Sequence, residues 1–489
     1  FCSTRRVGRA PQVGPPPADY FDVPVATRIL GAAKLTGKLW PSVNFGTMHA
    51  VTARERADVA LGGLESRAEV APLTYYRVAR ALKEFGERRH GLGTMVTLAQ
   101  RRFADRGLES LLNRQSLTAG LDGWHFLDRR RVWVLSGYAA TTRLAGTPER
   151  MTAVQRDPRH YLQRPDVSHL GVDSSATSLT GYAARLWLHK QQGSLLCNSA
   201  VGFISPKFDV NDMGYQSRSD LVNAHLGIGW SWNQPTRWRR RAWAIGALYE
   251  THDLGGNLTS RGVYASAEAQ LANNTVVHYN LNPIAAAYDN RRTRGGPLVE
   301  LPAGLQSDVT VATDQTRRLQ WGLELGGFRR PAAGSWNWSV GPSVTWKPVP
   351  SLGLSLGPAF ERIVEDAQYV RSVAAAEGEV PADFGGRHYV FARLDQQTVA
   401  ANIRLNVSFT PNLSLETYLQ PLISACRYAD FKELARAGSY DFVHYASAAE
   451  APVNPYEPAD PSFNYKSLRG NAVLRWEYRP GSVLYFVWT

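Results

Sequence analysis

Residues 208–215 read FDVNDMGY and place oxygen-bearing side chains at a spacing that could hold a metal ion. Asp209, Asn211 and Asp212, followed by a glycine, offer the hard oxygen ligands that Ca²⁺ prefers. A calcium loop, however, needs an acid or amide immediately before that glycine, where this chain has Met213, and no glutamate stands at the expected offset. A turn built from Asx side chains is the alternative interpretation. We therefore expect no resident metal and no other cofactor, and keep these three residues as a weak calcium candidate.

The histidines are the other candidates for chemistry. The sequence contains no G-x-S-x-G, H-E-x-x-H or P-loop motif, and its eleven histidines show no ligand spacing. Five of them could still meet a serine or an aspartate in three dimensions: His160, His169, His189, His225 and His278. Polar histidines on loops or on a lumen face are the alternative. We expect no enzyme, and an outer-membrane hydrolase stays a third hypothesis.

Polar side chains at every second position point to a different kind of site. Along 399–409 apolar residues alternate with Ala400, Asn402, Arg404, Asn406 and Ser408, and the alternation resumes after the turn at 410–412. Residues 335–348 show the same pattern, with three tryptophans on the apolar face. Because side chains alternate across a strand, one face meets lipid and the other an aqueous lumen. The lumen-lining candidates are Asn337, Ser339, Asn402, Arg404, Asn406, Glu416, Tyr418 and Gln420.

These residues need many strands to position them. The period-2 pattern predicts strands at 27–38, 43–54, 73–86, 92–104, 116–128, 131–143, 178–190, 194–204, 219–232, 237–251, 261–272, 275–288, 305–316, 319–330, 335–347, 351–364, 388–409, 412–427, 463–478 and 481–489. Short and long connections alternate, and only the link 331–334 is short where a long one is expected. We therefore predict an all-β fold: a large antiparallel transmembrane β-barrel of about 20–22 strands, with short periplasmic turns and long extracellular loops.

Two turns predict the register of their hairpins. If Phe409 pairs with Leu413, then Val407 falls opposite Leu415 and Asn406 opposite Glu416. In the earlier hairpin we expect Trp346 opposite Leu352 and Val344 opposite Leu354. Both registers keep all apolar residues on one face.

The tryptophans predict two interfacial girdles. Trp133, Trp187, Trp232, Trp238, Trp321, Trp346 and Trp476 lie near short turns, whereas Trp336 and Trp338 lie at the opposite end of their strand. The basic runs 129–131 and 237–241 also flank turns, as residues at a lipid headgroup boundary would. Although the net charge is +13, no helix-turn-helix, zinc-finger or RNP-type pattern accompanies these runs, so we expect no nucleic-acid partner.

The whole chain, 1–489, is predicted to be the barrel, with two long extracellular loops at 144–177 and 428–462. The first of these should hold a short helix that Thr147 caps and Pro148 begins, running to about Gln163. The orientation of strand 27–38 requires a strand before it, for which 1–9 is the only candidate, and an even strand number then requires a final strand after Thr489. In the competing interpretation, 483–489 is itself the last strand.

Several segments resemble a family of bacterial outer-membrane barrels of unknown function, whose members usually have an N-terminal carbohydrate-binding-like domain of the family 9 type. The matching segments include FCSTRRVGRAPQ (1–12), PLTYYRVARALKEF (72–85), SGYAATTRLAGTPE (136–149), VFARLDQQT (390–398) and SLRGNAVLRWEYRPGS (467–482). The chain departs from this family at both ends, because the carbohydrate-binding-like domain and the usual final strand are absent. The family brings no catalytic residues to transfer.

The expected function is therefore a pore or transport-type protein of the bacterial outer membrane that handles carbohydrate or another polar ligand. The alternative is a membrane anchor that displays its loops and a carbohydrate-binding-like domain for surface binding or export. The expected partners are outer-membrane lipid and lipopolysaccharide, the barrel-assembly machinery and a carbohydrate ligand.

Overall fold

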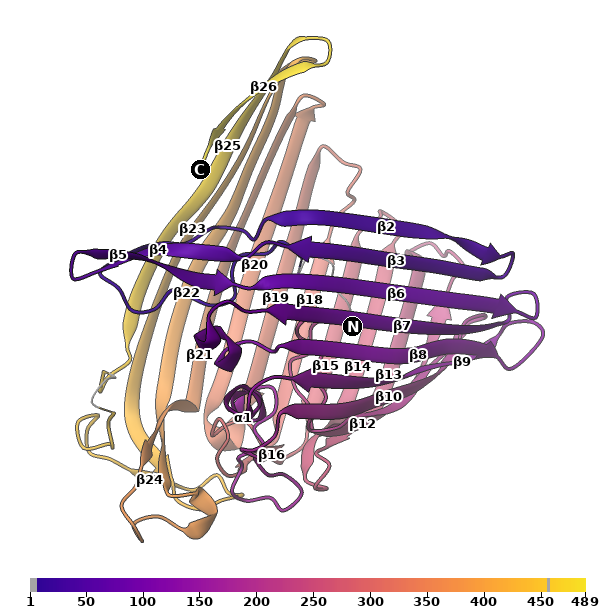
Figure 1. Cartoon of the computed structure of the whole chain (residues 1–489). Helices are drawn as coiled ribbons and strands as arrows, with labels where there is room; N and C mark the ends of the chain where they lie inside the picture. Colours follow the sequence, from indigo (N-terminus) through magenta and orange to yellow (C-terminus); the bar gives the residue numbers. More distant parts are fainter. Residues whose placement is uncertain (1–6, 455–457) are drawn as a thin grey trace.

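The chain folds into one large antiparallel β-sheet that is rolled into a barrel wall (Figure 1). The computed structural model describes residues 7–454 and 458–489. Within that part, twenty strands form the wall: β2 (Ile29–Trp40), β3 (Val43–Thr52), β6 (Leu73–Phe85), β7 (His90–Arg102), β8 (Gln115–Phe126), β9 (Trp133–Ala145), β10 (Ser178–Lys190), β11 (Leu195–Ile204), β12 (Leu221–Trp232), β13 (Arg239–His252), β14 (Leu258–Leu271), β15 (Val276–Ile284), β18 (Gly304–Ala312), β19 (Leu319–Arg330), β20 (Ser335–Val349), β21 (Leu352–Ala374), β22 (Arg387–Thr410), β23 (Leu413–Leu434), β25 (Phe463–Arg479) and β26 (Ser482–Trp488).

Each wall strand corresponds in order to a predicted strand, so the predicted fold class is confirmed. Consecutive wall strands pair antiparallel from β2 to β26, and β2 is exposed along its whole length. The further strand that we predicted at 1–9 falls mostly on residues 1–6, which lie outside the described part, and 7–9 form a turn and coil.

The alternation of the sequence determines the two faces of the wall. In β12, Leu226, Ile228 and Trp230 are exposed on one face, while Asn223 and His225 lie on the other. Apolar side chains on the outward face suit a membrane, and the polar side chains turn inward because successive residues of a strand point to opposite sides.

The predicted registers place every side chain on the correct face of the sheet, but some predicted cross-strand partners are wrong. Val407 pairs with Leu415 and Asn406 with Glu416 as expected, but a bulge next to the turn pairs Leu413 with Thr410 instead of Phe409. In the other hairpin Trp346 pairs with Leu354, two residues beyond the predicted partner, because β20 continues to Val349 and the turn shrinks to 350–351. A shift of two residues leaves every side chain on its original face.

The connections at the long-loop end differ from the prediction in several places. The short link at 331–334 is present, but β13 and β14 are also joined by only five residues, 253–257, so it is not the only short one at that end. β21, β22 and β23 are 23, 24 and 22 residues long; β21 and β23 extend well beyond their predicted ends, whereas β22 lies within one residue of its predicted bounds. The loop predicted at 428–462 therefore begins after Leu434, and it includes the short strand β24 (Phe442–His444).

Two smaller elements also lie at that end. Helix α1 (Pro148–Arg156) begins as predicted, with Thr147 accepting a hydrogen bond from the backbone N–H of Arg150. It ends seven residues before Gln163, because Asp157 precedes Pro158 and a residue before proline is biased toward extended backbone. The segment between β3 and β6 forms strands β4 (Glu55–Leu61) and β5 (Leu64–Ala71), which pair with β1 (Tyr20–Asp22) in a separate sheet.

Three long loops fold together into a structure that we call the loop layer, made of residues 146–177, 205–220 and 285–303. The last of these contains strands β16 (Ala287–Asp289) and β17 (Val299–Leu301). Figure 1 shows α1 and β16 close together between opposite sides of the wall, at the end of the barrel away from the short turns.

Hydrophobic contacts fix the loop layer to widely separated strands of the wall. Met213 packs with Ala50, Tyr76 and Ala99, which lie on β3, β6 and β7. Val299 packs in a buried cluster with residues of β21, β22 and β23. The loop layer therefore bridges the barrel from one side of the wall to the other.

Candidate functional site

The predicted lumen residues of β22 and β23 form a connected polar row. Asn406 pairs with Glu416 and Arg404 with Tyr418. The Tyr418 hydroxyl donates to Asn402 Oδ1 over 2.8 Å, and the Arg404 guanidinium lies 5.1 Å from the centre of the Tyr418 ring. Because cross-strand partners share a face, these side chains are neighbours on the polar side.

Of the remaining predicted lumen residues, one continues that row and two lie apart from it. Gln420 is on the same strand as Tyr418 and pairs with Arg469 of β25. Asn337 and Ser339 are on β20, where Ser339 pairs with Glu361 of β21. The eight candidates therefore form two stretches of one polar face, separated by β21, and not a single cluster.

A second polar group lies on the inner face of β10–β12, and we did not predict it. The Arg185 guanidinium donates from Nη1 to Asn223 Oδ1 over 2.6 Å and lies 3.4 Å from His225 Nδ1. His225 Nε2 lies 3.1 Å from Asn198 Oδ1. The alternation of polar residues at 221–232 was the available signal, but it could not show that three strands bring these side chains together.

A cavity of about 370 Å³ adjoins Arg185. The wall contributes Tyr138, Arg185, Asn223 and their neighbours, and the loop layer contributes residues 215–218. A volume of this size is within the range of small-molecule sites.

Most tryptophans of the predicted girdles face outward. Trp232, Trp238, Trp321, Trp338, Trp346 and Trp476 are each between 43% and 55% exposed. Trp336 and Trp133 alternate with polar-face residues of their strands and lie on the same outward side.

Trp187 is the exception, and its assignment to the girdle was wrong. It pairs with Ser136, its ring contacts Tyr138, and the Arg185 guanidinium lies 5.1 Å from the ring centre. Trp187 therefore belongs to the polar face. The prediction rested on proximity to a turn, whereas the face of Trp187 depends on the register of β10, which turns its odd-numbered residues inward.

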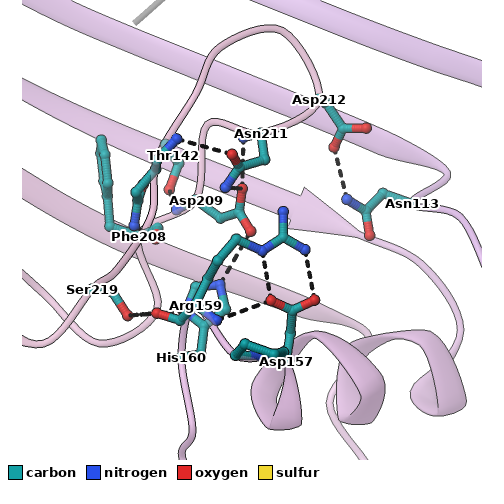
Figure 2. Close-up of polar contacts among 12 residues, drawn as sticks. Asn113, Thr142, Asp157, Arg159, His160, Phe208, Asp209, Asn211, Asp212 and Ser219 are labelled. Carbon is teal, nitrogen blue, oxygen red and sulfur yellow. Dashed lines mark hydrogen bonds and ion pairs between the residues drawn. The ribbon is translucent and has the colours of Figure 1, made fainter. Parts of the chain in front are cut away.

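The calcium candidate residues are bonded to protein groups (Figure 2). Asp209 Oδ1 accepts from the backbone and side chain of Asn211, and its Oδ2 lies 3.1 Å from His160 Nε2. Asp212 lies 2.6 Å from Arg101 and accepts a bond from Asn113. All four carboxylate oxygens thus have partners, and the geometry is that of an Asx-rich turn that fixes residues 205–220 to β7. Within residues 7–454 and 458–489, no group of three or more His, Cys, Asp or Glu side chains is arranged to hold a metal ion.

The same turn brings Ser219, His160 and Asp209 together, the residue types of a hydrolase triad (Figure 2). His160 Nδ1 lies 2.7 Å from the carbonyl of Pro206, closer than the 3.1 Å to Ser219 Oγ. Ser219 Oγ lies 2.8 Å from the carbonyl oxygen of Pro206 and 3.0 Å from that of Arg159, so its single proton is directed at these backbone acceptors. Since Nδ1 must donate to Pro206, it cannot accept the serine proton as a general base. Ser219 and His160 are also buried, so this cluster orders the loop.

The loop layer contains a buried ionic network centred on Arg164. Its guanidinium lies 3.4 Å from Asp253, 3.5 Å from Asp166 and 3.9 Å from Asp220. Asp166 accepts a bond from the backbone N–H of Leu298 over 2.6 Å, which joins residues 146–177 to 285–303.

Other arginines of the loop layer add to this network. Arg291 donates to the carbonyls of Pro158 and Arg159, and Arg292 lies 2.5 Å from Glu365 of β21. Burial and the neighbouring Arg218 lower the pKa of Arg291 to about 10, so it stays charged at neutral pH. Four connections and one wall strand are thus linked by charged contacts.

Among the described residues, no helix is both long and apolar enough to cross a membrane.

Together, the outward apolar face, the polar inner face and the loops at one end define a β-barrel of the outer-membrane type. A family model described as a domain of unknown function (DUF5916) matches residues 155–489, and the chain belongs to that family.

Similar solved structures are distant in sequence. A mutant of the ferric enterobactin receptor from Pseudomonas aeruginosa with enterobactin has 8% identity and a TM-score of 0.39, covering 91% of this chain and 75% of that one. The FrpB iron transporter from Neisseria meningitidis has 8% identity and a TM-score of 0.39, covering 91% and 72%. The outer membrane transporter YddB from Escherichia coli has 8% identity and a TM-score of 0.37, covering 91% and 68%. No curated protein matches the chain.

Proposed function

We propose that this chain is a transport-type barrel of the bacterial outer membrane, in which a polar solute passes along the inner wall and the loop layer acts as the gate. The observation that supports this most strongly is the combination of a polar inner face with a loop layer that spans the long-loop end. A wall of twenty strands encloses a bore too wide for its own side chains to fill.

The bonding of the loop layer supports a gate that can open. Arg164 Nη2 is buried without a hydrogen-bond partner among the described residues, and Arg164 Nε and Asp166 Oδ1 face each other only as an ion pair at 3.5 Å, without a hydrogen bond. A buried network that is only partly satisfied costs free energy, so the closed arrangement is less stable than a fully bonded one. This favours a loop layer that can leave its closed position over a permanent plug.

We propose that the polar residues of β20, β22 and β23, from Asn337 to Gln420, line the path. Their amide, hydroxyl and charged groups can exchange hydrogen bonds with a hydrated solute. A carbohydrate or another polar ligand matches these groups.

Conductance in planar lipid bilayers tests the pore. The wild-type chain should show rare openings, and Asp253→Asn should raise the open fraction because it removes a partner of the buried Arg164. Arg67→Gln is the matched control, since Arg67 forms an exposed ion pair with Asp58 in the β4–β5 hairpin. If none of the three proteins conducts, the transport proposal is wrong.

A membrane anchor is the second candidate, and the length of β21–β23 favours it. A strand crosses a bilayer with about 9–11 residues, so strands of 22–24 residues project far beyond the membrane. Such a projection could present a binding surface. The same bilayer measurement separates the two candidates, because an anchor with a sealed lumen does not conduct in any variant.

A further inference from the structure

The guanidinium of Arg185 faces the interior of the barrel with neutral partners. It contacts the Asn223 amide and the His225 ring, and it covers the face of Trp187. Within the described part of the chain, no carboxylate lies within ion-pair distance of Arg185. Arg80, which is also on the polar face, differs in this respect: it lies 2.7 Å from Asp122.

The hydrogen bonds also indicate that His225 adds no charge of its own. Its Nε2 faces the amide oxygen of Asn198, and its Nδ1 faces a guanidinium N–H of Arg185. Nδ1 must therefore be an acceptor while Nε2 bears the proton, which is the neutral tautomer. The charge of Arg185 is thus held in place by acceptors and is not neutralised.

Arg185 retains donors for a ligand. A guanidinium has five N–H groups in a planar fork. Asn223 and His225 occupy two of them. The rest can bind an oxyanion, for which a planar pair of N–H groups is well matched.

The cavity beside Arg185 has room for such a ligand. Its volume of about 370 Å³ is large enough for a monosaccharide-sized solute, and Asn223 and Ser217 offer further polar groups at its edge. Tyr215 of the loop layer, which is 77% exposed, lines the cavity as well. Displacement of residues 215–218 would uncover the cavity.

We propose that Arg185 and this cavity form a binding site for a small solute that bears an oxyanion, either a carboxylate or a phosphate. This inference rests on the proposed transport function, because it places the solute on the inner wall beneath the gate. It specifies the class of polar ligand: a negatively charged one, recognised on β10–β12 at a point distinct from the row on β22 and β23.

Isothermal titration calorimetry on the full chain in detergent tests the proposal without any need for conductance. Glucuronate and inorganic phosphate supply the two kinds of oxyanion, and glucose is the neutral match of glucuronate. We expect binding of at least one of the two anions and much weaker binding of glucose. Arg185→Gln should weaken anion binding about tenfold or more, because a charge-assisted hydrogen bond is lost. Arg185→Lys should restore part of the affinity, whereas Arg80→Gln should leave it unchanged.

Three results would overturn the proposal: no binding of either anion, equal binding of glucose and glucuronate, or equal weakening by Arg80→Gln and Arg185→Gln. Retention of heat-modifiable migration on gels checks that each variant is folded. Failure of the site and failure of the transport function are distinguishable, since a barrel that conducts but binds no anion refutes the site alone. A barrel that binds the anion but never conducts refutes transport alone.

Discussion

Arg164, on the segment after α1, lies 3.4 Å from Asp253, on the short link between β13 and β14, and both side chains are buried. The two residues are 89 positions apart in sequence. The contact joins a long loop to a hairpin of the wall. It is therefore one of the charged contacts that fix the loop layer to the wall.

Replacement of Arg164 by methionine should loosen the loop layer while leaving the barrel intact. It leaves Asp253 and Asp220 buried without their cation, and breaking a buried pair costs roughly 3–5 kcal/mol. We expect faster hydrogen–deuterium exchange in 158–170 and 285–303, measured by mass spectrometry. Exchange in the β12–β14 wall should not change.

The exposed pair Arg67–Asp58 again provides the control for this measurement. Both side chains are more than 60% exposed, so Arg67→Met should cost at most about 1 kcal/mol and leave the loop layer unchanged. Equal exchange in the two variants would show that Arg164 does not hold the loop layer.

The attachment of residues 205–220 should weaken in acid. Burial alone would raise the pKa of Asp212, but the charge of Arg101 and hydrogen bonds from Asn113 and Arg101 outweigh it, and the pKa lies below its ordinary value. A carboxylate with a lowered pKa in the folded state stabilises that state fully above the unfolded pKa of about 3.9, and this contribution is lost as the pH falls through the folded pKa.

Cleavage within 205–220 by an acid protease measures this effect. We expect little cleavage at pH 5 and a rise below pH 4. Asp212→Asn should be cleaved at both pH values, with less dependence on pH. Cleavage of the wild type that increases with rising pH would contradict a stabilising role for the ionised Asp212.

The wall could be predicted from the sequence because the period-2 alternation is a local property. Residues 399–409 display it within a single strand. Residues that face lipid there alternate with residues that face the lumen. The errors of register at Trp346 and Phe409 arose at turns, where one bulge or two added residues change the pairing without changing the face.

The loop layer and the Arg185 group could not be predicted, because their contacts join residues that are far apart in sequence. Arg101 and Asp212 are 111 positions apart, and nothing near either residue specifies its partner. FDVNDMGY could be recognised as a polar turn, but its partners lie on β7 and in the segment after α1. Trp187 was misassigned for a related reason: its distance from a turn is local, whereas its face depends on the register of β10.

Ser219 should not react as a nucleophile. Its hydroxyl is directed at backbone carbonyls, and His160 Nδ1 donates its proton to the carbonyl of Pro206. We therefore expect no labelling of the wild-type chain by a fluorophosphonate probe. Ser219→Ala should cost about 1 kcal/mol of loop stability through the lost hydrogen bond. Labelling at Ser219 that His160→Ala abolishes would instead establish a hydrolase.

Trp187 and Trp232 should differ in contact with lipid. Trp232 is 43% exposed on the outward face, whereas Trp187 lies under Arg185 on the polar face. In bilayers with brominated acyl chains, Trp232→Phe should reduce the quenched share of the fluorescence, because it removes a lipid-facing fluorophore. Trp187→Phe should remove unquenched fluorescence. The reverse pattern would mean that the faces of β10 are assigned wrongly.

Neighbouring positions on β22 should differ in contact with water. Asn406 pairs with Glu416 on the polar face, and Leu405 pairs with Thr417 on the other face. In a background with Cys2, Cys197 and Cys426 replaced by serine, Asn406→Cys should react with a membrane-impermeant thiol reagent at least about tenfold faster than Leu405→Cys in reconstituted bilayers. The reason is that the reactive thiolate forms in water and not in an apolar surrounding. Faster labelling of Leu405→Cys would place the polar face of β22 against lipid and remove the basis for a lumen lined by Asn402, Arg404 and Asn406.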